Sequence, residues 1–340
     1  MPVRDKAPLP KLHIVITVLV LLFSSFLFPA TVAGAETIGA GRVYTHASLR
    51  AMARVYMASG DYGKAEPFLE SAIDLAISTN APDADVCACS LDLAYLYKNQ
   101  GKLAEAETMC LTGLELQKDV YGPKHPHVAL TMRILADIYR GQGRFREATA
   151  CLEQALTIMR AVENEDDPAM APFKVDMARL LVAKGDLEQA ESYFDEAMSQ
   201  IEASYGPKHL YTSRVLTSMA TLYVLQGRYE EAEKLLDRAL PIQEKMYGAN
   251  HHFLVPAWLA MSRIHQARGD LARANAVLAK SLRVAEGQSN SSRLLGVLET
   301  LVQLAQTSGD AKQSAKLQRR IDKIRAGRQY AYAPVARAIQ

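Results

Sequence analysis

The sequence contains few cysteines, a single tryptophan and almost no net charge. Four cysteines and one tryptophan in 340 residues are too few for a disulfide framework, and no two cysteines have the C-x-x-C spacing of redox or zinc motifs. We expect buried thiols, although a single disulfide such as Cys89 with Cys110 remains open. The four cysteines are Cys87, Cys89, Cys110 and Cys151.

Catalytic motifs are also missing. The sequence has no G-x-S-x-G motif, no H-E-x-x-H motif and no glycine-rich phosphate loop after a predicted strand. The sequence therefore predicts a protein that is not an enzyme and that has no catalytic residues, no metal and no cofactor.

The small excess of positive charge lies at the N-terminus. The formal net charge is +2, and the first 35 residues account for all of it, so a nucleic-acid partner is not expected. Only the segment "KLQRRIDKIRAGR" (Lys316–Arg328) is strongly basic. It predicts a solvated helix that caps the fold, and docking on an acidic lipid or protein remains an alternative.

The N-terminus resembles an export signal. Basic residues precede an apolar run, Leu12–Phe28, which is followed by Pro29 and by the A-x-A sequence Ala33–Ala35. We expect residues 1–35 to be a signal peptide cleaved after Ala35 and the mature chain to be exported, most simply to a periplasm. Two alternatives remain, an inner-membrane anchor formed by residues 12–28 and secretion.

What the sequence does contain is a repeat. Seven glycines recur every 40 to 42 residues, and all but the last have small residues seven before them and five and twelve after them. A left-handed glycine ends helices, and small residues let two helices cross closely. The pattern predicts a helical hairpin around each glycine. These glycines are Gly60, Gly101, Gly143, Gly185, Gly227, Gly269 and Gly309.

The linkers between hairpins repeat as well. "YGPKHP" begins at Tyr121, "YGPKHL" at Tyr205 and "YGANHH" at Tyr247, whereas "ENEDDP" (Glu163–Pro168) replaces them once. Glycine can close one helix and proline can begin the next. Because no cysteine or carboxylate recurs with the linker histidines, these are expected to serve as linkers and caps rather than as metal ligands. They are His125, His127, His209, His251 and His252.

The segments "LADIYRGQGRFREATACLEQAL" and "MATLYVLQGRYEEAEKLLDRALPIQEKMYGANH" resemble the tetratricopeptide repeat, in the long 42-residue form of kinesin light chains. The resemblance implies an all-α fold, a right-handed superhelical solenoid of about seven antiparallel helical hairpins. We assign residues 36–324 to the repeat array and residues 325–340 to a flexible C-terminal tail.

The same resemblance implies a ligand site on the inner wall of the solenoid, formed by residues two, three, six, ten and thirteen before each hairpin glycine. The predicted groove residues are Arg54, Tyr95, Lys98, Asn99, Arg133, Asp137, Arg140, Arg179, Arg214 and Arg263, with Arg50, Thr221, Gln266 and Gln303 at further such positions. Two interpretations remain open. The arginines bind an acidic peptide or a C-terminal carboxylate, or they pair with neighbouring Asp and Glu side chains.

Kinesin light chains carry asparagines nine and ten residues before the glycine, and this sequence has none there, so binding of motor cargo is not expected. The sequence predicts an exported non-catalytic scaffold for protein–protein interaction. A peptide-binding or chaperone-like receptor for acidic segments is the alternative. The expected partner is a protein or peptide, and an acidic one where the arginines bind the ligand; neither a nucleic acid nor a small-molecule substrate is expected. A membrane contact is expected only if the N-terminal segment is uncleaved.

Overall fold

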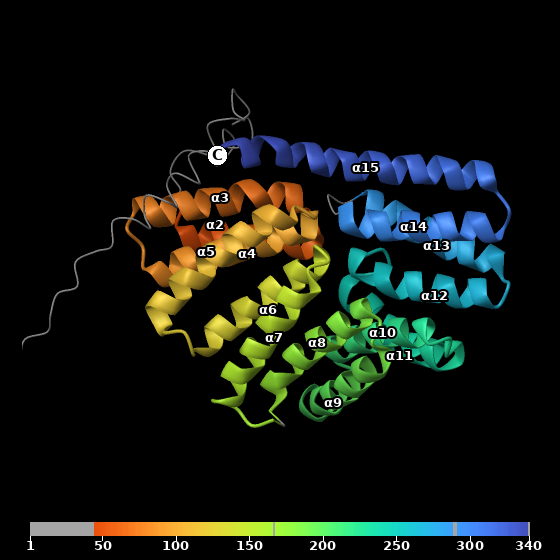
Figure 1. Ribbon diagram of the computed structural model, residues 1–340, viewed down its shortest axis with the longest axis horizontal. Coiled ribbons are helices and arrows are strands. Elements are labelled where there is room, and N and C mark those ends of the chain that lie inside the picture. The colour runs from red at the N-terminus through yellow and green to blue at the C-terminus, as the bar shows by residue number, and fades with distance from the viewer. Residues whose placement is uncertain (1–43, 166, 288–290, 339–340) are drawn as a thin grey trace, which may run out of the picture.

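The chain forms an all-α array of paired helices, as the sequence predicted (Figure 1). The computed structural model describes residues 44–165, 167–287 and 291–338. Seven antiparallel hairpins follow one another, and 3-10 turns η2 and η3 precede α8 and α12. The helices are α2 (His46–Ser59), α3 (Tyr62–Ser78), α4 (Asp83–Gln100), α5 (Leu103–Tyr121), α6 (Pro126–Gly141), α7 (Phe145–Arg160), η2 (Pro168–Met170), α8 (Ala171–Lys184), α9 (Leu187–Tyr205), α10 (Leu210–Leu225), α11 (Tyr229–Tyr247), η3 (His252–Leu254), α12 (Val255–Ala267), α13 (Leu271–Glu286), α14 (Ser291–Thr307) and α15 (Ala311–Ala338).

The repeated glycines and small residues have the structural roles that their spacing predicts. All seven hairpin glycines have a left-handed backbone, with φ between 76° and 88°. In hairpins 1 to 5, the alanines seven residues before and five residues after the glycine are buried where the two helices of a hairpin cross. Ala178 and Ala190, for example, are fully buried around Gly185. A larger side chain at these positions would separate the helices, so the small residues determine the packing distance within each hairpin.

The tyrosine and histidine of each repeated linker hold two hairpins together. Tyr121 stacks on His125 with ring centroids 4.8 Å apart, and Tyr205 stacks on His209 at 4.9 Å. The Nδ1 atom of His209 then accepts a hydrogen bond of 3.2 Å from the backbone N–H of Tyr211, at the start of α10. His125 and His251 cap the following helix or turn in the same way. The expected role of these three histidines as linkers and caps is therefore confirmed.

The array curves until its two ends meet. The first helices of consecutive hairpins contact one another, which places them on the inside of the curve. Hairpin 1 (α2–α3) meets the turn before hairpin 6 (α12–α13), because the Nε2 atom of His251 lies 3.1 Å from the carbonyl oxygen of Ala58. The Tyr62 hydroxyl lies 3.5 Å from Nε2 of His252. Figure 1 shows the orange first hairpins returning close to the blue last ones.

Two expectations concern the chain ends. The predicted signal peptide, residues 1–35, lies outside the described residues. Helix α15 continues to Ala338, through most of the segment for which the sequence predicted a flexible tail. Among the helices that the structure describes, none is both long and apolar enough to span a bilayer.

All four cysteines are free thiols. Cys87, Cys89 and Cys110 are buried, whereas Cys151 is partly exposed. The Sγ atom of Cys110 lies 3.6 Å from the carbonyl oxygen of Thr131. Burial raises the pKa of Cys110 to about 12 and that of Cys89 to about 11, so both thiols stay protonated at neutral pH. The expectation of buried thiols holds for three of the four residues.

Candidate inner-wall site

The inner wall carries a row of carboxylates that are each shared by two cations. The first is Asp92 on α4, which the sequence analysis did not include among the site residues. Its Oδ2 atom lies 2.5 Å from Nε of Arg50 and 2.8 Å from Nε of Arg54, both on α2. The hydrogen bond to Asp92 raises the pKa of Arg54. The predicted groove residue Arg54 is therefore already paired with an aspartate of the next hairpin.

Asp137 on α6 is the second shared carboxylate. Lys98 on α4 donates to its Oδ2 atom at 2.7 Å, and Arg140, one helical turn further along α6, donates to Oδ1. Burial alone would raise the pKa of Asp137, but the charges of Lys98 and Arg140 hold it well below its usual range. The predicted groove residues Lys98, Asp137 and Arg140 thus form one compact charged cluster.

The third shared carboxylate, Asp176 on α8, is held more loosely. Its oxygens lie 3.7 Å from Nη1 of Arg133 on α6 and 3.3 Å from Nη1 of Arg179 on α8. The Nε atom of Arg133 is buried and has no hydrogen-bond partner among the described residues. Arg179 also donates to the Ser218 hydroxyl on α10, at 3.0 Å from Nη2. Compensation of positive charge is therefore weaker here than at the first two carboxylates.

The row of carboxylates ends at α8 and does not continue on α10. Ser218 lies nine residues before its hairpin glycine, the position that holds Asp92 and Asp176 in other hairpins. Neither α10 nor α12 contains an aspartate or a glutamate, yet these helices carry Arg214 and Arg263. Within residues 44–165, 167–287 and 291–338, neither of these two arginines forms an ion pair. The inner wall of hairpins 5 and 6 therefore has positive charge without a neutralising carboxylate.

Two aromatic side chains lie among these arginines. Burial raises the pKa of Tyr211 to about 12, and the guanidiniums of Arg133, Arg179 and Arg214 act against that rise. The Arg214 guanidinium lies 5.8 Å from the ring centroid of Phe253. A guanidinium that lies over an aromatic ring keeps its N–H groups available at its edge. This part of the wall can therefore donate hydrogen bonds to an anionic group.

Two predicted groove residues are engaged locally. The Asn99 side-chain amide donates to the carbonyl oxygen of Tyr95 at 2.7 Å, and the Lys98 ammonium lies 4.6 Å from the Tyr95 ring centroid. Sequence reasoning missed Asp92, Asp176, Ser218 and the aromatic neighbours. The recurrence of aspartate nine residues before the glycine would have indicated the two aspartates. The two aromatic residues, Tyr211 and Phe253, do not recur in every hairpin, so the repeat pattern does not point to them. Their position beside the arginines depends on how the array curves.

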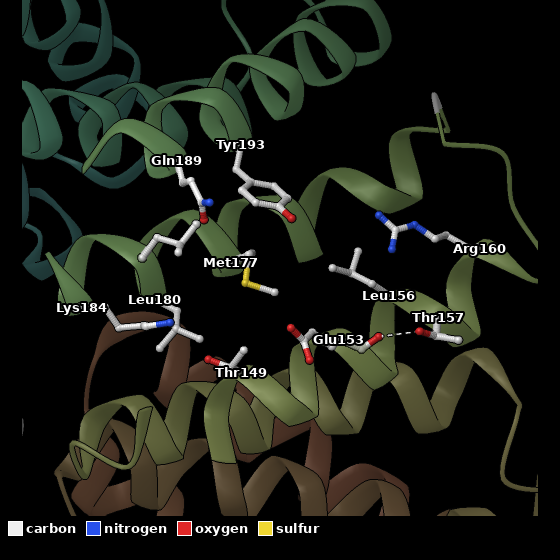
Figure 2. A pocket seen from close by; sticks show the side chains of 11 residues that line it. Thr149, Glu153, Leu156, Thr157, Arg160, Met177, Leu180, Lys184, Gln189 and Tyr193 are labelled. Carbon is white, nitrogen blue, oxygen red and sulfur yellow. Dashed lines mark hydrogen bonds between the residues drawn. The ribbon is translucent and has the colours of Figure 1, made fainter. Parts of the chain in front are cut away.

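A separate pocket opens between hairpins 3 and 4, away from the row of carboxylates. Its volume is about 320 Å³. Figure 2 shows the lining side chains converging from three helices, with α7 contributing Glu153, α8 contributing Met177 and Lys184, and α9 contributing Tyr193. The lining combines apolar side chains, such as Leu156 and Leu180, with polar ones, such as Glu153 and Lys184. None of the predicted groove residues lines this pocket.

The sequence matches the family model described as "Tetratricopeptide repeat" over residues 86–161, 170–245 and 219–287, and a second model with the same description over residues 48–81. These segments cover well over half of the chain, which therefore belongs to the tetratricopeptide repeat family. No curated protein matches the sequence significantly.

Several solved structures share this fold at low sequence identity. A Rap protein complexed with competence and sporulation factor is 13% identical, with a TM-score of 0.71 over 96% of this chain and 89% of that one. The Rap conjugation gene regulator of plasmid pLS20, in complex with the Phr* peptide, is 14% identical, with a TM-score of 0.69 over 96% and 87%. Aspartyl phosphate phosphatase F from Bacillus subtilis is 11% identical, with a TM-score of 0.61 over 82% and 70%. At these identities the likeness concerns the fold alone.

Proposed function

We propose that this protein is a non-catalytic scaffold that binds a protein or peptide on the inner wall of its tetratricopeptide array. The observation that carries the proposal is the charge balance of that wall. Three carboxylates are shared among six cations, and the carboxylates stop at α8 while the arginines continue to α12. The inner wall is therefore positive, most of all where it lacks acidic groups.

A positive wall of this kind suits an extended acidic segment. Arginine presents several N–H donors in a plane and can use some for an internal aspartate and others for a ligand. The solved Rap structures support a peptide ligand by analogy of fold, because they are complexes with competence and sporulation factor and with the Phr* peptide. We infer that a receptor for acidic segments is the more specific form of the scaffold function.

We further propose that the protein acts outside the inner membrane, in a periplasm or after secretion. The basic start, the apolar run Leu12–Phe28 and the A-x-A sequence before residue 36 support this location. Proteolytic removal of residues 1–35 can be read directly from the N-terminus of the mature protein. Recovery of an intact N-terminus in a membrane fraction would instead support the anchored form.

The binding proposal is tested by capturing partners from the native host with the tagged full chain and a chemical cross-linker. An inner-wall variant carries Arg133→Gln, Arg179→Gln and Arg214→Gln. A matched control carries the same change on second helices at Arg146, Arg238 and Arg273, which lie on α7, α11 and α13. We expect a stoichiometric partner that the wild type and the control retain and that the inner-wall variant loses. Equal capture by both variants would place the partner elsewhere and overturn the proposal.

A further inference from the structure

Most junctions between hairpins carry the same polar contact, which we call the inter-hairpin clamp. It joins a glutamate six residues after one hairpin glycine to side chains just before and just after the next. Between hairpins 2 and 3, Glu107 on α5 accepts from Gln142 at 2.8 Å and from Nη1 of Arg144 at 2.8 Å. The Arg144 guanidinium also lies 4.2 Å from the Tyr139 ring centroid.

The inter-hairpin clamp recurs at three other junctions. Between hairpins 1 and 2, Glu66 accepts from Gln100 at 2.8 Å and from Lys102 at 2.6 Å. Between hairpins 4 and 5, Glu191 accepts from Gln226 at 2.9 Å and from Arg228 at 2.6 Å. Between hairpins 5 and 6, Arg268 supplies both bonds to Glu233, at 2.9 and 2.7 Å. Four junctions are thus tied by charge-assisted hydrogen bonds on the side of the second helices.

The junction between hairpins 3 and 4 lacks this clamp. Thr149, Lys184 and Asp186 occupy the three clamp positions. The Thr149 hydroxyl donates to the carbonyl oxygen of Phe145 in its own helix, and the Asp186 carboxylate caps its own helix. The aromatic position is Leu181 instead of tyrosine. Within the described part of the chain, no side-chain hydrogen bond joins these positions across the junction.

The absence of the clamp coincides with looser packing. Thr149, Leu181 and Lys184 all line the pocket of about 320 Å³ in Figure 2. On the inner wall, the same junction is bridged by Arg133 and Asp176 at 3.7 Å, compared with 2.7 Å for Lys98 and Asp137 at the preceding junction. Between hairpins 3 and 4 the second-helix clamp is therefore missing and the inner-wall ion pair is long, whereas Arg160 and Gln200 hold the linker at Glu165.

The last junction, between hairpins 6 and 7, also lacks the glutamate, because Asn275 occupies its position. There, however, a different ion pair joins the two hairpins. Arg320 on α15 lies 2.6 Å from Glu286 at the end of α13. No comparable second-helix ion pair joins hairpins 3 and 4 among the described residues. Among the described residues, the joint between hairpins 3 and 4 is therefore the one internal junction that has neither the clamp nor a second-helix ion pair in its place.

This joint lies midway along the array, opposite the place where the ends meet. The closing contact includes the hydrogen bond from the His251 ring to Ala58 and the contact between Tyr62 and His252, and α14 packs against α4 beside them. Burial and the nearby charge of Arg293 lower the pKa of His252 to about 3, so this ring is neutral at physiological pH. Its Nδ1 atom is buried without a hydrogen-bond partner among the described residues, which weakens the closure.

We propose that the array opens at this closing contact by bending at the joint between hairpins 3 and 4, and that the opening admits a partner to the inner wall. Solenoid repeats interact mainly with their neighbours, so a single weak junction concentrates bending at one place. A clamped array would distribute the same bending over all its junctions. The bending itself does not depend on the identity of the partner.

Hydrogen exchange of the full chain tests the joint without any ligand. In the wild type, amides of α8 are expected to exchange at least about tenfold faster than the repeat-equivalent amides of α6. The variant Thr149→Glu, Lys184→Gln, Asp186→Arg installs the clamp and should reduce that difference to about threefold or less. The single change Thr149→Glu, which places a carboxylate near Lys184, serves as a milder version that leaves the Asp186 cap intact.

The reciprocal variant Glu107→Thr, Gln142→Lys, Arg144→Asp moves the unclamped sequence to the junction between hairpins 2 and 3. It should accelerate exchange in α6 by about tenfold. The decisive readout lies at the closing contact, far along the chain from the substitutions. Hydrogen exchange of the η3 amides should slow when the clamp is installed between hairpins 3 and 4. Equal exchange rates of the α6 and α8 amides in the wild type would overturn the proposal that bending is concentrated at the joint between hairpins 3 and 4. If installing the clamp slows exchange in α8 but leaves exchange in η3 unchanged, bending at the joint is not coupled to opening of the closing contact, and that part of the proposal is overturned. Either result leaves the proposed binding function intact, because partner capture is measured separately.

Discussion

Replacing Asp137 by asparagine should destabilise the protein more than any other single change of charge on the inner wall. The substitution leaves the Lys98 ammonium and the Arg140 guanidinium facing each other without their shared carboxylate. Breaking a fully buried ion pair costs about 3–5 kcal/mol. Here the side chains of Lys98, Asp137 and Arg140 are 19%, 24% and 35% exposed, so screening reduces the expected loss to about 2–3 kcal/mol.

The loss should depend on pH in a defined direction. The two cations lower the pKa of Asp137 in the folded protein, compared with about 3.9 in an unfolded chain. A carboxylate whose pKa is lower in the folded protein than in the unfolded chain stabilises the fold at pH values above its pKa in the unfolded chain. This stabilisation is lost progressively as the pH falls from that value towards the pKa in the folded protein. The stability gap between wild type and Asp137→Asn should therefore be constant above about pH 5 and shrink towards pH 3.

Urea unfolding followed by circular dichroism, repeated between pH 7 and pH 3, measures this gap. Asp119→Asn is the matched control, because Asp119 is exposed on the second helix α5; its cost should stay within about 0.5 kcal/mol at all pH values. A gap below about 1 kcal/mol at pH 7, or a gap that does not change with pH, would refute the reasoning.

Three further predictions concern the packing of the repeat. His209→Ala removes the cap on α10 and the stack on Tyr205 and should cost about 1 kcal/mol, read from thermal unfolding, whereas Lys208→Ala in the same linker should cost almost nothing. Ala178→Leu, at a fully buried crossing point, should cost about 1–3 kcal/mol in urea, and Ala183→Leu, on the exposed face of the same helix, should be tolerated. A thiol reagent should modify Cys151 first in the folded protein, and Cys110 only at the rate of unfolding; equally rapid labelling of both would contradict the burial of Cys110.

Much of the fold could be predicted because it is repeated. A glycine such as Gly185 and the alanines that surround it fill the same positions in almost every hairpin, and each position has one steric requirement. The linker histidines were likewise readable, since a histidine between a tyrosine-glycine pair and a helix start has few roles other than capping.

The charged contacts of the inner wall were harder to predict. The sequence placed Arg133 and Arg179 on the wall but did not decide whether they face a ligand or an aspartate, because that depends on rotamers and on the distance between hairpins. The unclamped joint also had a signal, since Thr149 and Lys184 interrupt an otherwise regular pattern. That signal acquires a meaning only when the regular partners, such as Glu107 and Arg144, are seen in contact.

The central claim is that the inner wall binds an acidic segment where the row of carboxylates stops, and Ser218→Asp tests it most directly. This change restores the aspartate of other hairpins beside Arg179, which now donates to the Ser218 hydroxyl, and should leave the fold intact. The measurement is fluorescence anisotropy of the full chain with a labelled (Glu-Ala)6 peptide, compared with (Gln-Ala)6.

The account predicts that the wild type prefers the glutamate peptide and that Ser218→Asp weakens its binding by about tenfold. Ser199→Asp, on the exposed face of α9, should leave the affinity unchanged. An undiminished affinity of the Ser218→Asp variant, or equal binding of both peptides to the wild type, would contradict the account.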